Sequence, residues 1–85
     1  MQFYLNKLGA PDWPTRYHAA VMLTAYSSLP CVRTALRDAL WFEDNRAVRR
    51  IIAWTLANYC PFEPGIWPLL ADLSRRDGFY RKHSA

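Results

Sequence analysis

The chain has 85 residues, of which 52% are hydrophobic and 15% aromatic, and its formal net charge is +4. This length suits one small domain, and the apolar content is sufficient for a core, which excludes an intrinsically disordered chain. Nine of the eleven cationic residues are arginines. Because arginine pairs well with carboxylates and phosphates, the composition allows an acidic partner.

Several features predict a cytoplasmic protein that makes no contact with a membrane. The two cysteines, Cys31 and Cys60, are too few for a disulfide framework, and we expect both to be free thiols. The N-terminal residues lack the basic segment and apolar run of a secretory signal. The longest stretch without Asp, Glu, Lys or Arg, residues 17–32, is too short and too polar to span a bilayer.

In chain order, the spacing of apolar residues predicts five helices and no strand. The first, at about residues 2–8, is short and stops at a glycine. The second, at about residues 14–27, follows a suitable N-cap in Asp12 and has Pro14 in its first turn. A turn of serines and a proline leads to the third helix, at about residues 31–42.

The fourth predicted helix, at about residues 46–59, is capped by the pair Asp44 and Asn45. A segment rich in proline, residues 60–65, then breaks the helical pattern. The fifth helix, at about residues 66–75, ends at the Asp-Gly pair that follows it, and the remaining tail is expected to fray.

The sequence repeats itself at a spacing of 33 residues. Identical residues at this spacing are Arg16 and Arg49, Ala20 and Ala53, Leu23 and Leu56, Tyr26 and Tyr59, Leu36 and Leu69, Leu40 and Leu73, and Asp44 and Asp77. Self-similarity at a period of about 20–50 residues is typical of stacked supersecondary units. The chain is therefore expected to form a single domain with an N-terminal capping helix (1–11), repeat one (12–43), repeat two (44–77) and a tail (78–85).

The two copies resemble HEAT-type repeats, the helical hairpins of alpha-solenoids. The second copy reads DNRAVRRIIAWTLANY followed by PGIWPLLADLSRRD, with an Asp near the turn, a Val-Arg pair and a leucine-rich second helix. The first copy, DWPTRYHAAVMLTAY followed by PCVRTALRDALWFED, has Thr15 where the second has Val48. The resemblance covers residues 12–77 and implies an all-α fold, a short right-handed stack of helical hairpins.

The resemblance also assigns a structural role to several charged residues. In such repeats, the arginine that opens the first helix pairs with an aspartate of a neighbouring turn. This implies that Arg16 and Arg49 form structural ion pairs with acids among Asp12, Asp44 and Asp77. Arrays of this kind normally need three or more units. Because two copies would leave an end face poorly covered, we expect a homodimer or an obligate protein partner.

A stripe of Arg33, Arg37 and Trp41, at steps of four on the third helix, is the leading candidate for partner binding. Second helices of the resembling hairpins line the concave face, where binding usually occurs, and Trp and Arg are enriched at binding hot spots. The alternative is that Trp41 folds inward while Asp38 and nearby acids neutralise the arginines.

A second cationic cluster, Arg46, Arg49 and Arg50, lies at the start of the fourth helix, where the helix dipole disfavours positive charge. It is expected either to pair with neighbouring acids, including Glu43, or to bind an anionic partner. Arg75 and Arg76, at the end of the fifth helix, could also contact a partner.

Three other tryptophans are interpreted from their positions. Trp54, with Ile51, is expected in the core because the fourth helix would lie between neighbours. Trp67, at the start of the fifth helix, either anchors a turn or is exposed. Trp13, beside a proline, is expected to pin the turn of the first repeat.

No arrangement of residues in the sequence predicts catalysis, a metal or a cofactor. His18 and His83 are isolated from each other and from the cysteines, whereas zinc needs four ligands at characteristic spacings. Asp38 near Trp41 is the only weak candidate for a catalytic carboxylate beside an aromatic wall.

The leading hypothesis is a non-enzymatic protein-binding module, an adaptor or small inhibitor that docks on a larger protein assembly through the arginine and tryptophan surface. The alternative is a nucleic-acid-binding protein that uses the same arginines for phosphate contacts. The modest net charge, the interleaved acids and the lack of a recognised reading motif make this the second choice.

Overall fold

The computed structural model describes residues 1–77, and its description of side chains ends at Arg75. In chain order, the helices are α1 (Gln2–Lys7), α2 (Trp13–Thr24), α3 (Pro30–Phe42), α4 (Arg46–Tyr59) and α5 (Ile66–Asp77). These residues contain no strand, so the predicted all-α fold of five helices is confirmed.

The bounds of α2 and α5 differ slightly from those predicted. α2 ends at Thr24 because the backbone then closes tighter turns, in which the amides of Tyr26 and Ser27 donate to the carbonyls three residues earlier. α5 continues to Asp77, two residues beyond the predicted end. Within residues 1–77, the single positive φ angle is that of Gly65, at 80°, directly before α5.

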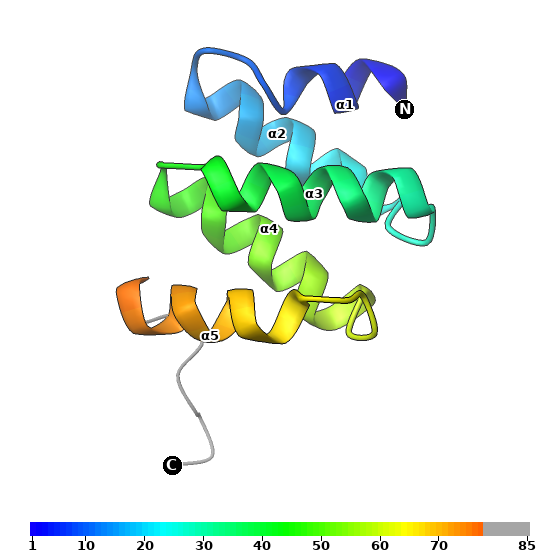
Figure 1. Ribbon diagram of the computed structural model, residues 1–85. Helices are drawn as coiled ribbons and strands as arrows, with labels where there is room; N and C mark the ends of the chain where they lie inside the picture. The colour runs from blue at the N-terminus through cyan, green and yellow to red at the C-terminus, as the bar shows by residue number, and fades with distance from the viewer. Residues whose placement is uncertain (78–85) are drawn as a thin grey trace.

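The helices form two layers. Figure 1 shows α1, α3 and α5 running in the same direction in one layer, while α2 and α4 cross them obliquely in the other. α4 packs against α2, α3 and α5, and α1 packs against α2. α4 is therefore the central element, and it buries five residues along its length, Val48, Ile52, Ala53, Thr55 and Leu56.

Two equivalent N-caps begin the helices of the second layer. Asp12 accepts a hydrogen bond from the backbone amide of Thr15 at 3.1 Å. Asn45, 33 residues later, accepts from the amides of Ala47 and Val48 at 2.9 and 3.1 Å. Each side chain satisfies amides that the first turn of a helix leaves without a partner. Both predicted caps are confirmed, with Asn45 acting in the predicted pair.

The sequence repeat coincides with a repeat in burial. Buried residues that lie 33 positions apart are Ala19 and Ile52, Ala20 and Ala53, Leu23 and Leu56, Ser27 and Cys60, Leu36 and Leu69, and Leu40 and Leu73. Two side-chain contacts join the repeats directly. The hydroxyl groups of Thr24 and Thr55 are 2.9 Å apart, and the Cys60 thiol donates to the carbonyl of Ser27 at 3.6 Å. The right-handed stacking and the likeness to HEAT-type repeats stay predictions.

The N-terminal helix α1 covers one end of the core. Tyr4, Leu5 and Leu8 pack against the buried residues, and the ring of Tyr4 meets His18 of α2 edge-on at 6.0 Å. The opposite side of α1 carries the exposed Phe3 and Lys7, whose ammonium group lies 5.3 Å from the centre of the Phe3 ring.

The expectation that Trp54 belongs to the core is wrong, since this residue is 45% exposed. α4 buries the sides that meet α2, α3 and α5, and Trp54 lies on the side that the described residues leave open. Its ring meets that of Tyr59 edge-on at 5.7 Å. Ile51, its predicted companion, is half-buried and packs against the core.

Trp67 and Trp13 lie in the first turns of α5 and α2. The Trp67 indole N–H donates to the carbonyl of Pro61 at 2.8 Å while much of the ring stays exposed, so this side chain both anchors its turn and faces solvent. Trp13 is also exposed and meets the ring of Tyr17 edge-on at 6.3 Å.

Candidate partner-binding surface

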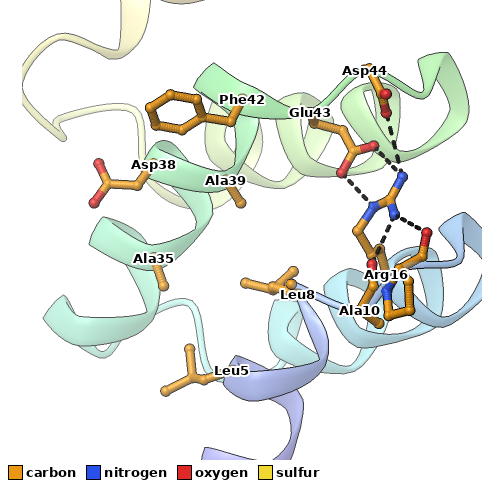
Figure 2. Close-up of a pocket in the computed structure, with 12 residues that line it drawn as sticks. Leu5, Leu8, Ala10, Arg16, Ala35, Asp38, Ala39, Phe42, Glu43 and Asp44 are labelled. Carbon is orange, nitrogen blue, oxygen red and sulfur yellow. Dashed lines mark hydrogen bonds and ion pairs between the residues drawn. The ribbon is translucent and has the colours of Figure 1, made fainter.

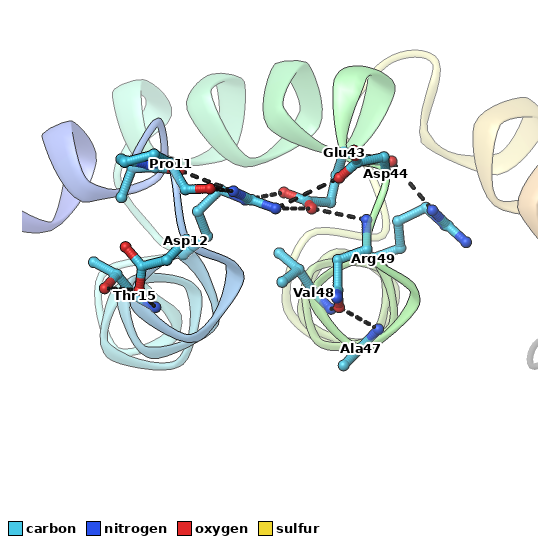
Figure 3. A network of polar contacts seen from close by, with 11 residues as sticks. Pro11, Asp12, Thr15, Glu43, Asp44, Ala47, Val48 and Arg49 are labelled. Carbon is cyan, nitrogen blue, oxygen red and sulfur yellow. Dashed lines mark hydrogen bonds and ion pairs between the residues drawn. The ribbon is translucent and has the colours of Figure 1, made fainter.

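Arg16, near the start of α2, joins three parts of the fold. Its Nε and Nη2 atoms donate to the two carboxylate oxygens of Glu43, at 2.9 and 3.0 Å. Its Nη1 donates to the carbonyls of Ala10 and Pro11, at 2.8 and 3.0 Å. Figure 2 shows Arg16 with its contacts to Ala10 and Glu43, and Figure 3 shows Pro11, before α2, and Glu43, after α3, in the same network. The hydrogen bonds to Glu43 raise the pKa of Arg16 above its usual value.

Glu43 is the main partner of Arg16, and sequence reasoning missed this role for it. The Glu43 side chain is only 5% exposed and also accepts from the backbone amide of Asn45 at 2.9 Å, which holds the cap of α4 in place. Asp44, one of the three acids that the family resemblance offered as partners, lies 3.5 Å from Arg16, and its side chain is 93% exposed. The bidentate geometry makes Glu43 the stronger contact.

The remaining predicted ion-pair residues have other contacts. The side chain of Asp12 accepts from Thr15, and this hydrogen bond lowers the pKa of Asp12. The Nη1 atom of Arg49 donates to the carbonyl of Glu43 at 3.3 Å. Arg16 makes the equivalent contact with Ala10, because each arginine donates to the carbonyl of the residue six positions earlier. The side chain of Asp77 lies outside the described part of the chain.

Arg33 and Arg37, two of the predicted binding residues, hold the turn between α4 and α5. Arg33 Nε lies 3.2 Å from one carboxylate oxygen of Glu63, and Arg37 Nη1 lies 3.1 Å from the other. Arg33 also donates to the carbonyl of Ser28 and Arg37 to that of Pro64. The structure thus favours the alternative in which acids neutralise these arginines, with Glu63 as the main acid and Asp38 3.8 Å from Arg37.

Trp41, the third residue of the predicted stripe, does not fold inward. It is 68% exposed, and its neighbour Phe42 is 82% exposed. We call Trp41 and Phe42, at the C-terminal end of α3, the aromatic ridge. Phe42 was not among the predicted binding residues, although its place beside Trp41 at the end of an amphipathic helix was a signal for an exposed aromatic side chain.

A groove of about 580 Å³ lies on the Phe42 side of the ridge, between α1 and α3. Figure 2 shows Leu5 and Leu8 of α1 across the groove from Ala35 and Ala39 of α3. The space between the two helices exists because α3 presents alanines there and α1 is only six residues long. The full lining is Leu5, Leu8, Gly9, Ala10, Pro11, Arg16, Ala35, Asp38, Ala39, Phe42, Glu43 and Asp44.

The charged residues of this α1–α3 groove are one arginine and three acids, which gives a formal charge of −2. Arg16 and Glu43 neutralise each other at one end of the groove. Asp38 and Asp44 remain, with side chains 67% and 93% exposed. The groove is therefore apolar along its walls and acidic at its edge, although the whole chain is basic.

A smaller groove of about 80 Å³ lies on the Trp41 side, between α3 and α5. It is lined by Leu40, Trp41, Leu69, Asp72 and Leu73. The aromatic ridge thus stands between two hollows on the layer formed by α1, α3 and α5.

The other predicted binding arginines do not line either groove. Arg46 and Arg50 are exposed on α4, and Arg46 also takes part in an interaction within the chain. Arg75 lies 3.0 Å from Asp72 of its own helix. Arg76 belongs to α5, and its side chain lies outside the described part.

In the described residues, the titratable groups do not gather into a metal centre. In the part of the chain that the structure describes, no group of three or more His, Cys, Asp or Glu residues could hold a metal ion. Cys31 is exposed, whereas Cys60 is buried, and its burial raises the pKa of the thiol. His83 lies outside the described residues.

No protein-family model matches the chain, and no curated protein or solved structure matches it significantly. Among residues 1–77, none of the helices has both the length and the apolar character needed to cross a bilayer.

Proposed function

We propose that the chain is a non-enzymatic protein-binding module, an adaptor or small inhibitor, that docks on a larger protein assembly through the aromatic ridge and the two grooves beside it. The observation that carries this proposal is the exposure of Trp41 and Phe42, at 68% and 82%, between two hollows. Transferring such a side chain from water into an interface contributes about 1.5–3 kcal/mol, and tryptophan is enriched at binding hot spots.

The binding surface proposed here differs from the arginine stripe predicted from the sequence. Glu63 engages both Arg33 and Arg37, so both guanidinium groups are already held by contacts within the fold. In the surface proposed here, Trp41 keeps its role and Phe42 joins it. We propose Arg46, Arg50, Arg75 and Arg76 only as peripheral contacts for a large partner.

Nucleic-acid binding is the weaker candidate because phosphates would meet acids at the proposed surface. The α1–α3 groove carries a formal charge of −2, and like charges repel at contact distance. A nucleic acid would therefore have to use arginines away from the ridge.

The test replaces the ridge and a matched pair of exposed aromatics elsewhere. Trp41→Ala with Phe42→Ala is the ridge variant, and Trp54→Ala with Phe62→Ala is the control, since it removes the same side-chain types from the exposed set. Each tagged protein is incubated with host lysate, with and without nuclease treatment, and bound proteins are identified by mass spectrometry. A candidate partner is then purified and titrated against all three proteins by calorimetry.

The proposal expects a purified partner that binds the parent and control chains alike and binds the ridge variant at least tenfold more weakly. Equal binding to both variants would place the contact elsewhere. If binding disappears after nuclease treatment, the nucleic-acid hypothesis replaces this one.

A further inference from the structure

We infer that the α1–α3 groove receives a basic amphipathic helix from the partner protein. This inference rests on the proposed function, because it names the chemistry of the partner at one side of the aromatic ridge. The alternatives are an uncharged apolar segment, a small molecule and a second copy of this chain.

The walls of the groove specify the apolar part of this ligand. Leu5 and Leu8 face Ala35 and Ala39 across the space, and Phe42 extends one wall outward. The hollow between these walls has a volume of about 580 Å³. Because the two walls are helices, the hollow is a groove between rods, which suits the apolar face of a third helix.

The edge of the groove specifies the charge of this ligand. Arg16 lies 3.5 Å from Asp44 but donates two shorter hydrogen bonds to Glu43, at 2.9 and 3.0 Å. Arg37 lies 3.8 Å from Asp38 and closer to Glu63, at 3.1 Å. Because the side chains of Asp38 and Asp44 are 67% and 93% exposed, lysine or arginine side chains of a partner can reach both carboxylates. The long apolar stems of such side chains would also cover the groove walls.

A second copy is disfavoured as the occupant by the charge of the chain. Each copy has a formal net charge of +4, and this charge opposes association of identical chains. A basic helix on another protein would bring cations to the acidic groove without the repulsion between two identical chains.

The probe is a pair of fluorescein-labelled helical peptides that share an apolar face of Leu and Ala. One carries lysines on its other face and the second carries glutamates. Binding to the intact chain is followed by fluorescence anisotropy at two salt concentrations. We expect the lysine peptide to bind at least tenfold more tightly than the glutamate peptide, and added salt to reduce the difference.

Four substitutions locate the binding. Ala39→Phe fills the groove and should abolish binding of the lysine peptide, whereas Ala71→Phe, on the exposed side of α5, should leave binding unchanged. Asp38→Asn and Asp44→Asn should each weaken binding by about two- to fivefold, the range for exposed ion pairs. Circular dichroism checks that every variant is folded.

Equal binding of both peptides would overturn the inference, and so would binding that survives Ala39→Phe in a folded protein. Self-association in sedimentation experiments that is lost in Ala39→Phe would instead make a second copy the occupant. Failure of this inference can be distinguished from failure of the proposed function. If the ridge variant loses a captured partner and Ala39→Phe retains it, the function stands and the groove inference fails.

Discussion

Arg16 and Arg49 illustrate how two copies of one sequence unit can differ at a single position. Both arginines donate to the carbonyl six residues earlier, at 2.8 and 3.3 Å. Arg16 also forms an ion pair with the carboxylate of Glu43. The residue 33 positions after Glu43 is an arginine, Arg76. The backbone contact is thus repeated, whereas the acid at the position of Glu43 is not.

This pair predicts unequal effects of two neighbouring substitutions. Glu43→Gln should lower the free energy of unfolding by about 1.5–3 kcal/mol, the range for hydrogen bonds to charged groups, because Arg16 would lose the ionised acceptor at a site that is largely buried. Asp44→Asn should change it by less than about 0.5 kcal/mol, since that side chain is 93% exposed. Urea denaturation measures both changes in the free energy of unfolding. Equal losses would contradict a larger contribution from the pair of Arg16 and Glu43.

A second prediction at the residue scale concerns acid stability. The hydrogen bond from Thr15 lowers the pKa of Asp12 below its usual value of 3.8 in the folded protein. A carboxyl group with a lowered folded pKa contributes stability that is present above the unfolded pKa and is lost as the pH falls through the folded pKa. Stability should therefore decline below about pH 3.8.

The variant Asp12→Asn keeps a capping oxygen and removes the titration. Its unfolding free energy should depend less on pH than that of the parent chain below pH 3.8. Urea titrations at a series of acidic pH values compare the two proteins, and parallel curves would contradict the proposed role of the cap.

At the scale of elements, a set of ion pairs and one glycine conformation fix the turn between α4 and α5. Glu63 is held by Arg33 and Arg37 of α3, and Gly65 has a φ of 80°, which non-glycine residues rarely adopt. The ion pairs hold the turn against α3, which lies about thirty residues earlier in the chain. The conformation of Gly65 sets the direction in which α5 begins.

The conformational role of Gly65 can be tested by substituting two glycines with alanine. Gly65→Ala should destabilise the protein by about 1–2 kcal/mol through its left-handed conformation alone, because a Cβ atom there would meet nothing within 4 Å. Gly9→Ala, where φ is not positive and the nearest atom is 3.8 Å away, should be neutral or stabilise by up to about 1 kcal/mol. Thermal denaturation gives both values, and a similar effect at the two sites would refute the explanation.

The elements show why sequence reasoning succeeded for the helices and was less complete for the surface. Apolar spacing and caps such as Asp12 and Asn45 are local signals, so they predicted five helices and the two N-caps. Periodicity identifies the apolar side of a helix but not the number of neighbours around it, which is why Trp54 was misplaced in the core. The pairing of Glu63 with α3 joins residues far apart in the chain, and no local pattern encodes it.

At the scale of the whole molecule, the two repeats depend on each other. α2 packs against α1 and α4, and the buried Leu23 and Leu56 belong to one core. A single hairpin would leave its inner side exposed to water, and chains this small have little stability to lose. The sequence units are therefore not independent folding units.

This dependence predicts that repeat one does not fold alone. A peptide of residues 12–43 should show little helical circular dichroism in water, because isolated short helices are marginal without tertiary contacts. The full chain should unfold in one transition that is the same by circular dichroism and by tryptophan fluorescence. A helical peptide, or two separated transitions, would show that the hairpins are autonomous.

The common direction of α1, α3 and α5 in Figure 1 has an electrostatic consequence. Each helix carries a partial negative charge at its C-terminal end, and these ends lie along the same edge of the layer, where α3 also presents Asp38 and Phe42. The backbone dipoles therefore add to the field of the carboxylates, and they give the layer a polarity along its axis. A helix laid between α1 and α3 would be favoured in the antiparallel direction, with its positive N-terminal end toward that edge, so the surface would select the orientation of a bound helix as well as its charge.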